Sequence, residues 1–159
     1  MIKEAELLSF LEARNLTLGA VESITGGLFA STICSVPGAS KVFKGSLVTY
    51  SCELKESILG ISKDAIERYG VVSNEIAYLM AKKGSEILHS DITIAVTGNA
   101  GPDKEEGAAE VGQVWIGVSY QKRIWTIPVK FNLERNDLRK ATVSTMFNLI
   151  RSLFPDEKN

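Results

Sequence analysis

Histidine and cysteine are scarce in this sequence. Its 159 residues include one histidine, His89, and two cysteines, Cys34 and Cys52, which do not form a CxxC pair. These side chains do not make a convincing set of zinc ligands, so we expect neither a metal nor another cofactor. Both cysteines are expected to be reduced packing residues, as in cytosolic proteins. His89 lies at a predicted helix end, away from every motif described below, and is expected to be a surface or capping residue.

An excess of basic residues is absent as well. The chain carries 18 lysines and arginines against 19 aspartates and glutamates, and no basic cluster runs along it. Binding to nucleic acid needs a basic face, so this balance disfavours direct DNA binding. No apolar run approaches the roughly 18 residues that a membrane-spanning helix needs, and the N-terminus lacks the apolar core of a signal peptide. We expect a soluble, cytoplasmic protein with no nucleic-acid or membrane partner.

The remaining composition is that of a folded domain. Hydrophobic residues make up 45% of the chain and charged residues 23%, which argues against disorder. Single domains commonly have about 100–200 residues, so we expect residues 1–159 to form one domain, with 155–159 as a short tail. A chain of this length buries about two-thirds of its unfolded surface and needs no disulfide or metal to stabilise it.

Apolar periodicity, capping residues and breaks at glycine or proline divide the chain into helices and strands. Helices are predicted at 3–14, 28–35 and 53–59, from a cap at Ser62 to about Tyr69, at 74–88 after a cap at Ser73, and from a cap at Asn136 or Asp137 to about Phe154. Strands are predicted at 17–21, 46–51, 92–97, 114–120 and 124–131, with the last two as a hairpin and 98–112 as a loop. This order predicts an α/β protein with three layers, α/β/α, around a mixed, mostly parallel sheet of about five strands.

The first candidate for chemistry is the segment Glu22-Ser23-Ile24-Thr25-Gly26-Gly27, between a strand and a helix. Free backbone N–H groups at the start of such a helix can meet an anion, and the glycines let it approach the main chain closely. The segment also fits a tight turn in which Ser23 or Thr25 caps the helix. It matches neither a Walker loop nor GxGxxG, so no nucleotide-binding fingerprint applies.

Two further loops follow predicted strands. Tyr50 ends one strand, and Lys55 lies one turn into the next helix. A desolvated lysine beside a serine can act as its general base, although a solvated helix face is the simpler interpretation of Lys55. Thr97-Gly98-Asn99-Ala100-Gly101-Pro102 lies where ligands of open α/β sheets bind, but it equally fits a plain loop before the acidic run 103–106. Composition and spacing alone leave the chemistry open.

Taken together and in this order, these segments resemble the CinA C-terminal domain family over about residues 4–152. The matching motifs are Glu22-Ser23-x-Thr25-Gly26-Gly27, Val36-Pro37-Gly38-Ala39-Ser40 with Phe43 and Gly45, Tyr50-Ser51-x-x-x-Lys55, Gly70-Val71-Val72-Ser73, Thr97-Gly98-x-Ala100-Gly101-Pro102 and Val111-Gly112-x-Val114-Trp115. Each motif is weak alone, but the set is specific.

The resemblance implies an amidohydrolase of pyridine nucleotide salvage, which converts nicotinamide mononucleotide to nicotinic acid mononucleotide and ammonia. It implies that Ser23 is the nucleophile and Lys55 its base, and that Tyr50 and Thr97 position or polarise the reacting groups. The residues implied to bind the mononucleotide are Thr25, Gly26, Gly27, Gly98, Asn99, Ala100, Gly101 and Arg135. Arg135 is implied to contact the phosphate, and the Gly26-Gly27 helix start to bind that phosphate or to supply N–H groups to an oxyanion.

The chain departs from the family pattern at four places. Ile24 replaces the usual cysteine, Asn99 stands in place of an apolar residue, and Glu134 stands where aspartate is typical. The loop 103–110 lacks the expected Gly-Gly and Lys-Pro elements. The departures at Asn99 and 103–110 bear on the substrate pocket.

A non-catalytic nucleotide- or phosphate-binding module of the competence/damage-inducible family is the alternative function. The Ser23–Lys55 pair favours the enzyme, because binding alone does not require it. Members of the family often self-associate, so we also expect a homo-oligomer, for which the strands within 114–131 could offer an edge.

Overall fold

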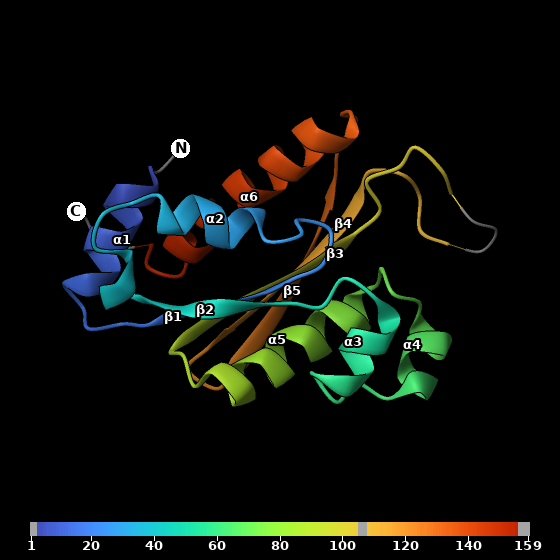
Figure 1. Ribbon diagram of the computed structural model, residues 1–159, viewed down its shortest axis with the longest axis horizontal. Helices are drawn as coiled ribbons and strands as arrows, with labels where there is room; N and C mark the ends of the chain where they lie inside the picture. The colour runs from blue at the N-terminus through green and yellow to red at the C-terminus, as the bar shows by residue number, and fades with distance from the viewer. Residues whose placement is uncertain (1–2, 105–107, 156–159) are drawn as a thin grey trace.

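The computed structural model describes residues 3–104 and 108–155, and a five-stranded mixed sheet lies at its centre (Figure 1). The strands are β1 (Leu18–Glu22), β2 (Phe43–Val48), β3 (Ile92–Gly98), β4 (Gln113–Tyr120) and β5 (Arg123–Lys130). Their order in the sheet is β2-β1-β3-β4-β5. β1 is parallel to both of its neighbours, whereas β4 is antiparallel to β3 and to β5. The carboxyl ends of β2, β1 and β3 therefore meet at one edge of the sheet.

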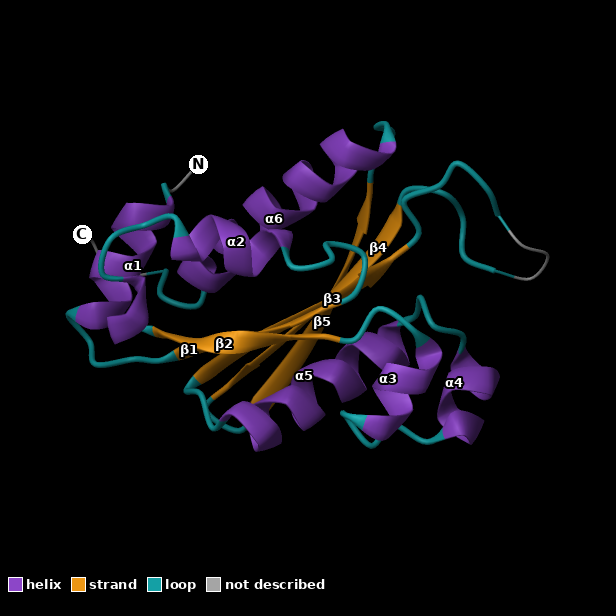
Figure 2. Cartoon of the chain, viewed as in Figure 1, coloured by secondary structure: helices purple, strands orange, loops and turns teal. Residues whose placement is uncertain are grey.

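Six α-helices form the two outer layers. They are α1 (Glu4–Glu12), α2 (Leu28–Cys34), α3 (Cys52–Ser57), α4 (Lys63–Tyr69), α5 (Asn74–Leu88) and α6 (Arg135–Ser152), and a 3-10 turn, η1, spans Ala39–Lys41. α1, α2 and α6 cover one face of the sheet, and α3, α4 and α5 cover the other (Figure 2). Serine side chains cap three of the helix starts, because Ser51 accepts from the backbone N–H of Leu54, Ser62 from that of Ala65 and Ser73 from that of Ile76.

The strands alternate between two apolar cores. Ala20 and Ile94 belong to the core beneath α1, α2 and α6, whereas Val21 and Ala95 belong to the core beneath α5. Helix α5 lies very close to the sheet at Gly117, where a Cβ atom would come within 2.4 Å of the carbonyl oxygen of Ala77. The central strands β1 and β3 are therefore buried on both faces, and the predicted three-layer fold with its five-stranded mixed sheet is confirmed.

The second strand and the last helix are shifted from their predicted positions. β2 spans Phe43–Val48 rather than 46–51, because the chain leaves the sheet to begin α3 and the Ser51 side chain accepts from the backbone N–H of Leu54. α6 begins at Arg135, and Glu134 is its N-cap without a side-chain capping bond. The prediction that Asn136 or Asp137 caps this helix is therefore wrong.

The prediction for the two cysteines is wrong, whereas the prediction for the histidine is confirmed. Cys34 and Cys52 are free, but both are exposed, so the prediction that they pack in the interior is wrong. They lie at the end of α2 and the start of α3, where each helix faces solvent. His89 is the C-cap of α5 with φ of 51°, which confirms its predicted capping position. Within the acidic run, Glu105 and Glu106 lie outside the described residues.

Across residues 3–104 and 108–155, no helix combines the length and apolarity needed to span a bilayer.

Candidate active site

Three buried residues with hydroxyl side chains lie side by side where β2, β1 and β3 end. The register of the strands makes Thr49, Ser23 and Thr97 neighbours. The ladder continues into them, since Thr49 N donates to Glu22 O at 2.9 Å and Ser23 N donates to Val96 O at 3.1 Å. Strand alternation turns their side chains toward the α3 and α5 layer. This row places Ser23 in the middle of the carboxyl edge of the sheet.

Lys55 approaches Ser23 from α3. Its Nζ atom lies 2.9 Å from Ser23 Oγ and 2.7 Å from the carbonyl oxygen of Thr49. The lysine is 0% exposed and Ser23 is 7% exposed, so the pair is shielded from bulk water. The structure thus brings the predicted nucleophile and base within hydrogen-bond distance, the geometry that a Ser–Lys pair needs.

Burial lowers the pKa of Lys55 toward neutral pH. Desolvation lowers its pKa from 10.5 to about 8, and a smaller Coulombic effect of Cys52 opposes the shift. The ion pairs recorded for the described residues all lie elsewhere. At pH 7.5 an ordinary lysine is only about 0.1% neutral, whereas one with a pKa of about 8 is roughly one-quarter neutral. Lys55 can therefore accept a proton near neutral pH.

Glu22 anchors the loop that carries Ser23. Its fully buried carboxylate accepts hydrogen bonds from Phe29 N at 2.9 Å and Ala30 N at 3.2 Å, and from Ser46 Oγ at 2.7 Å. The carboxylate satisfies two N–H groups in the first turn of α2, where an anion is favourable. Two of the donors expected to meet a phosphate or an oxyanion at the Gly26-Gly27 helix start are therefore already in use.

The turn itself depends on its two glycines. Gly26 and Gly27 have φ of 55° and 96°, in the left-handed region that side chains disfavour. Gly26 N donates to the carbonyl oxygen of Ser23 at 3.0 Å, and Leu28 N donates to that of Thr25 at 3.0 Å. The glycines thus serve first to turn the chain tightly between β1 and α2.

Arg139, on α6, also holds this loop and was not singled out in the sequence. Its Nε donates to Ile24 O at 3.2 Å and its Nη2 to Thr25 O at 2.7 Å. A third contact joins Nη1 to Asn136 Oδ1 at 3.4 Å. Neither spacing nor composition separates Arg139 from an ordinary polar helix position, because its two carbonyl partners lie more than 100 residues earlier in the chain.

Arg135 links two of the predicted loops. Its Nη1 donates to Gly101 O at 2.6 Å and its Nη2 to the hydroxyl oxygen of Tyr50 at 3.1 Å. Tyr50 is 58% exposed, so much of its ring lies at the surface. The structure groups Arg135, Tyr50 and Gly101 into one cluster at the rim of the site.

Thr97 and Gly98 support the Ser23 loop from the next strand. The Thr97 hydroxyl donates to Val71 O at 2.8 Å, which ties the end of β3 to the segment before α5. A Cβ atom at Gly98 would come within 2.8 Å of Ile24 Cδ1, so the glycine lets the loop pack closely on β3. Ala100 is 8% exposed and belongs to the core beneath α6.

Asn99 closes its own loop. Its Nδ2 donates to Ala109 O at 2.9 Å, and its Oδ1 accepts from Gly101 N at 3.0 Å. Asn99 N and Asn99 O also bond with Gln113 O and Gly112 N. The amide that replaces the family's apolar residue thus bonds to backbone groups of Gly101 and Ala109.

Two buried hydroxyls, one in the Ser23 loop and one directly after β2, have no hydrogen-bond partner among the described residues. They are Thr25 Oγ1 and Thr49 Oγ1, and both threonines are 0% exposed. Thr49 was not singled out in the sequence, although it directly precedes Tyr50. Unpaired hydroxyls of this kind are unusual in a folded interior, and Thr49 also contributes the carbonyl oxygen that accepts from Lys55.

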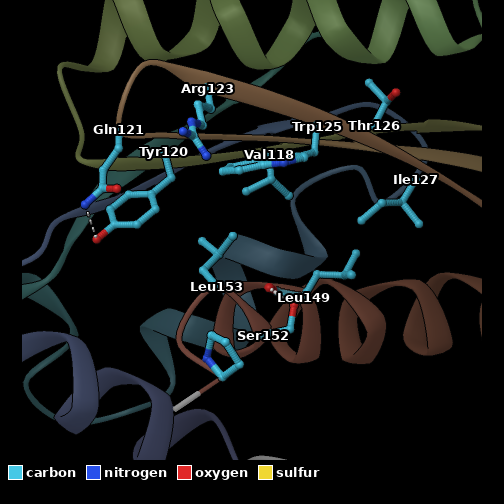
Figure 3. Close-up of a pocket in the computed structure, with 11 residues that line it drawn as sticks. Val118, Tyr120, Gln121, Arg123, Trp125, Thr126, Ile127, Leu149, Ser152 and Leu153 are labelled. Carbon is cyan, nitrogen blue, oxygen red and sulfur yellow. Dashed lines mark hydrogen bonds between the residues drawn. The ribbon is translucent and has the colours of Figure 1, made fainter. Parts of the chain in front are cut away.

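A separate cavity of about 540 Å³ lies between the β4–β5 hairpin and the C-terminal half of α6. Figure 3 shows Trp125 and Ile127 on the sheet side and Leu149 and Leu153 on the helix side. Ser23 is not among its lining residues. The described parts of the chain bring no three His, Cys, Asp or Glu side chains together as a metal site.

Two curated proteins are similar to this chain over most of its length. A CinA-like protein from Petrotoga mobilis is 40% identical over 148 residues, which cover 92% of this chain and 37% of that protein. A protein named as competence-damage inducible, from Limosilactobacillus reuteri, is 50% identical over 141 residues, which cover 87% of this chain and 34% of that protein. The chain thus spans only about a third of the length of these relatives.

Solved structures agree with the fold. The CinA superfamily protein from Escherichia coli aligns with a TM-score of 0.91 at 29% identity, covering 94% of this chain and 87% of that one. Its counterpart from Enterobacter cloacae aligns with a TM-score of 0.87 at 30% identity, covering 94% and 91%. The family model for the CinA C-terminal domain matches residues 2–154, and the chain belongs to that family.

Proposed function

We propose that this chain is an amidohydrolase that converts nicotinamide mononucleotide to nicotinic acid mononucleotide and ammonia, in pyridine nucleotide salvage. The observation that carries the proposal is the 2.9 Å contact between Lys55 Nζ and Ser23 Oγ in a buried site. A buried lysine with a lowered pKa and no carboxylate partner among the described residues is costly to keep for stability alone. Its position against a serine suits a nucleophile and its base.

In the first half of the reaction, Ser23 Oγ attacks the carboxamide carbon while neutral Lys55 accepts the hydroxyl proton. The C–O bond forms, and the carbonyl oxygen becomes an oxyanion. The C–N bond then breaks as the Lys55 ammonium gives its proton to the departing nitrogen, which leaves as ammonia. An acyl ester on Ser23 remains.

In the second half, water attacks the ester carbon and Lys55 accepts a proton from that water. Collapse of the second tetrahedral intermediate breaks the C–O bond to Ser23, and the lysine returns the proton to Oγ. The product is nicotinic acid mononucleotide, whose carboxyl group then loses its proton to water and becomes a carboxylate. One lysine thus serves as base and acid in each half of the reaction.

Backbone N–H groups of the Ser23 loop are suited to bind the oxyanion. Ile24 N and Thr25 N form no hydrogen bond with the described residues, whereas Gly26 N is already bonded. One well-placed donor of this kind lowers the barrier by about 3–4 kcal/mol. Arg135, at the rim with Tyr50, supplies the positive charge for the substrate phosphate.

The alternative, a binding module without catalysis, leaves the Ser23–Lys55 contact without a role. Asn99, where the chain departs from the family pattern, bonds within its own loop, so this departure does not favour the binding module. We therefore favour the amidase, which gives the Ser23–Lys55 contact a role.

The test is ammonia release from nicotinamide mononucleotide by wild type, Ser23→Ala and Lys55→Ala. Ser9→Ala and Lys63→Ala are matched controls, because both residues are exposed and lie on other helices. We expect turnover in wild type and in both controls, and a loss of at least about 10³-fold in each active-site variant. Wild-type rates in both active-site variants would end the Ser–Lys mechanism. Tight binding of the mononucleotide without turnover by wild type would instead support the binding module.

A further inference from the structure

Arg139, on α6, donates hydrogen bonds to two successive carbonyl oxygens of the Ser23 loop. Its Nε bonds Ile24 O at 3.2 Å and its Nη2 bonds Thr25 O at 2.7 Å. The second carbonyl also accepts from Leu28 N. Two neighbouring peptide planes just after Ser23 are thus fixed by a single guanidinium.

The fixed carbonyl determines the direction of an N–H group. Ile24 O and Thr25 N belong to one trans peptide, in which the C=O and N–H bonds point in opposite directions. Arg139 comes from α6, on the face of the sheet opposite α3 (Figure 1). Because Ile24 O is drawn toward α6, the N–H of Thr25 is directed toward the other layer, from which Lys55 reaches Ser23.

That N–H group is available. Thr25 N forms no hydrogen bond with any described residue, although Thr25 itself is 0% exposed. Buried backbone donors are nearly always paired. The unpaired Thr25 N–H lies two residues after the proposed nucleophile, Ser23, and this position indicates a donor that binds a ligand. The guanidinium on the carbonyl of the same peptide also polarises it and strengthens the N–H as a donor.

We propose that Arg139 is a positioning residue that orients the Thr25 N–H as an oxyanion donor for the Ser23 reaction. The inference rests on the proposed function, because it assumes that Ser23 attacks a carbonyl. Arginine suits the role since its planar, multiply donating head can bond both carbonyls at once, whereas the ammonium of a lysine is a compact point charge. Arg139 itself does not touch the substrate.

The test compares wild type, Arg139→Met and Arg139→Lys, with Lys140→Met as the control. Lys140 is the next residue of α6, exposed, and its only recorded contact among the described residues is with Asp137 at 3.9 Å. Two rates are measured for each protein: turnover of nicotinamide mononucleotide, and modification of Ser23 by a fluorophosphonate, followed by mass spectrometry. The second rate depends on Ser23 and its oxyanion donors and does not depend on which amide is the substrate.

We expect Arg139→Met to lower kcat and the modification rate about 10²-fold, as for the loss of one oxyanion donor, with KM changed less than about threefold. The control should match wild type. If Arg139→Met does not fold, Arg139→Lys decides, and we expect it to fold and to lose at least about tenfold in both rates.

Unchanged rates in a folded Arg139 variant would overturn the role of Arg139 while leaving the amidase intact. Modification of Ser23 that depends on Arg139, without turnover of the mononucleotide, would support Arg139 and overturn only the proposed substrate. A wild-type Ser23 that the reagent does not modify would overturn both.

Discussion

Replacing Lys55 by methionine should abolish activity and yet stabilise the fold at neutral pH. The pKa of Lys55 is lowered from 10.5 to about 8 by desolvation, which corresponds to a cost of about 3 kcal/mol for keeping the ammonium buried at pH 7. Methionine keeps an unbranched side chain of similar length and removes the charge. The substitution also removes the hydrogen bonds to Ser23 Oγ and Thr49 O, worth about 1 kcal/mol each.

The balance is a gain of about 1 kcal/mol at pH 7, which raises Tm by roughly 2–4 °C for a domain of this size. The stabilisation by Lys55→Met becomes a destabilisation as the pH rises. Between the folded pKa of about 8 and the unfolded value of 10.5, the unfolded wild type binds more protons than the folded protein, so its stability rises with pH. Between pH 7 and pH 9.5 the free energy of unfolding of wild type rises by about 2 kcal/mol, so Lys55→Met becomes the less stable protein at pH 9.5.

Urea unfolding of both proteins at pH 7 and pH 9.5 measures this difference, with the exposed Lys63→Met as the control for a lost surface charge. A Lys55→Met protein that is less stable than wild type by 2 kcal/mol or more at pH 7 would refute the reasoning. So would a stability difference that stays constant across this pH range.

Three further predictions concern the proposed reaction, the loop that carries Ser23 and the packing of α5 on the sheet. The kcat/KM of wild type should rise with pH and level off with an apparent pKa of about 8, because only neutral Lys55 accepts the Ser23 proton; a flat profile from pH 6 to 9 would contradict this. Glu22→Gln places an amide N–H against donors and should cost about 1–3 kcal/mol in urea unfolding, whereas the exposed Glu53→Gln should change little. Gly117→Ala should destabilise by about 1–3 kcal/mol, because its Cβ would lie 2.4 Å from Ala77 O; a neutral effect would show that α5 can shift away from β4.

The fold was predictable because local signals agreed with one another. Ser62 and Ser73 mark helix starts in the sequence and accept the capping hydrogen bonds in the structure. The apolar run at β3 is buried on both faces, as a central strand requires. The errors lie where a local signal was ambiguous. Cysteine is usually buried, but at the two helix ends here it faces solvent.

The site was only partly predictable, because it depends on contacts between distant segments. The spacing of Ser23 and Lys55 does not reveal their contact, which follows from the pairing of β1 with β2 and from the start of α3. Glu22 resembles any acidic residue after a strand, and only its buried bonds to α2 disclose its role. Arg139 resembles a solvent-facing helix residue in the sequence. Its role requires knowing that α6 lies over the Ser23 loop.

We propose that Ser23 becomes covalently acylated by a carboxamide substrate. Acylation is tested most directly by mixing wild type with excess nicotinamide mononucleotide, quenching with acid within milliseconds, and determining the mass of the peptide that contains Ser23. We predict an acyl adduct on Ser23 in wild type and none in Ser23→Ala. Release of ammonia by wild type at a rate equal to that of Ser23→Ala, with no adduct on Ser23, would contradict it.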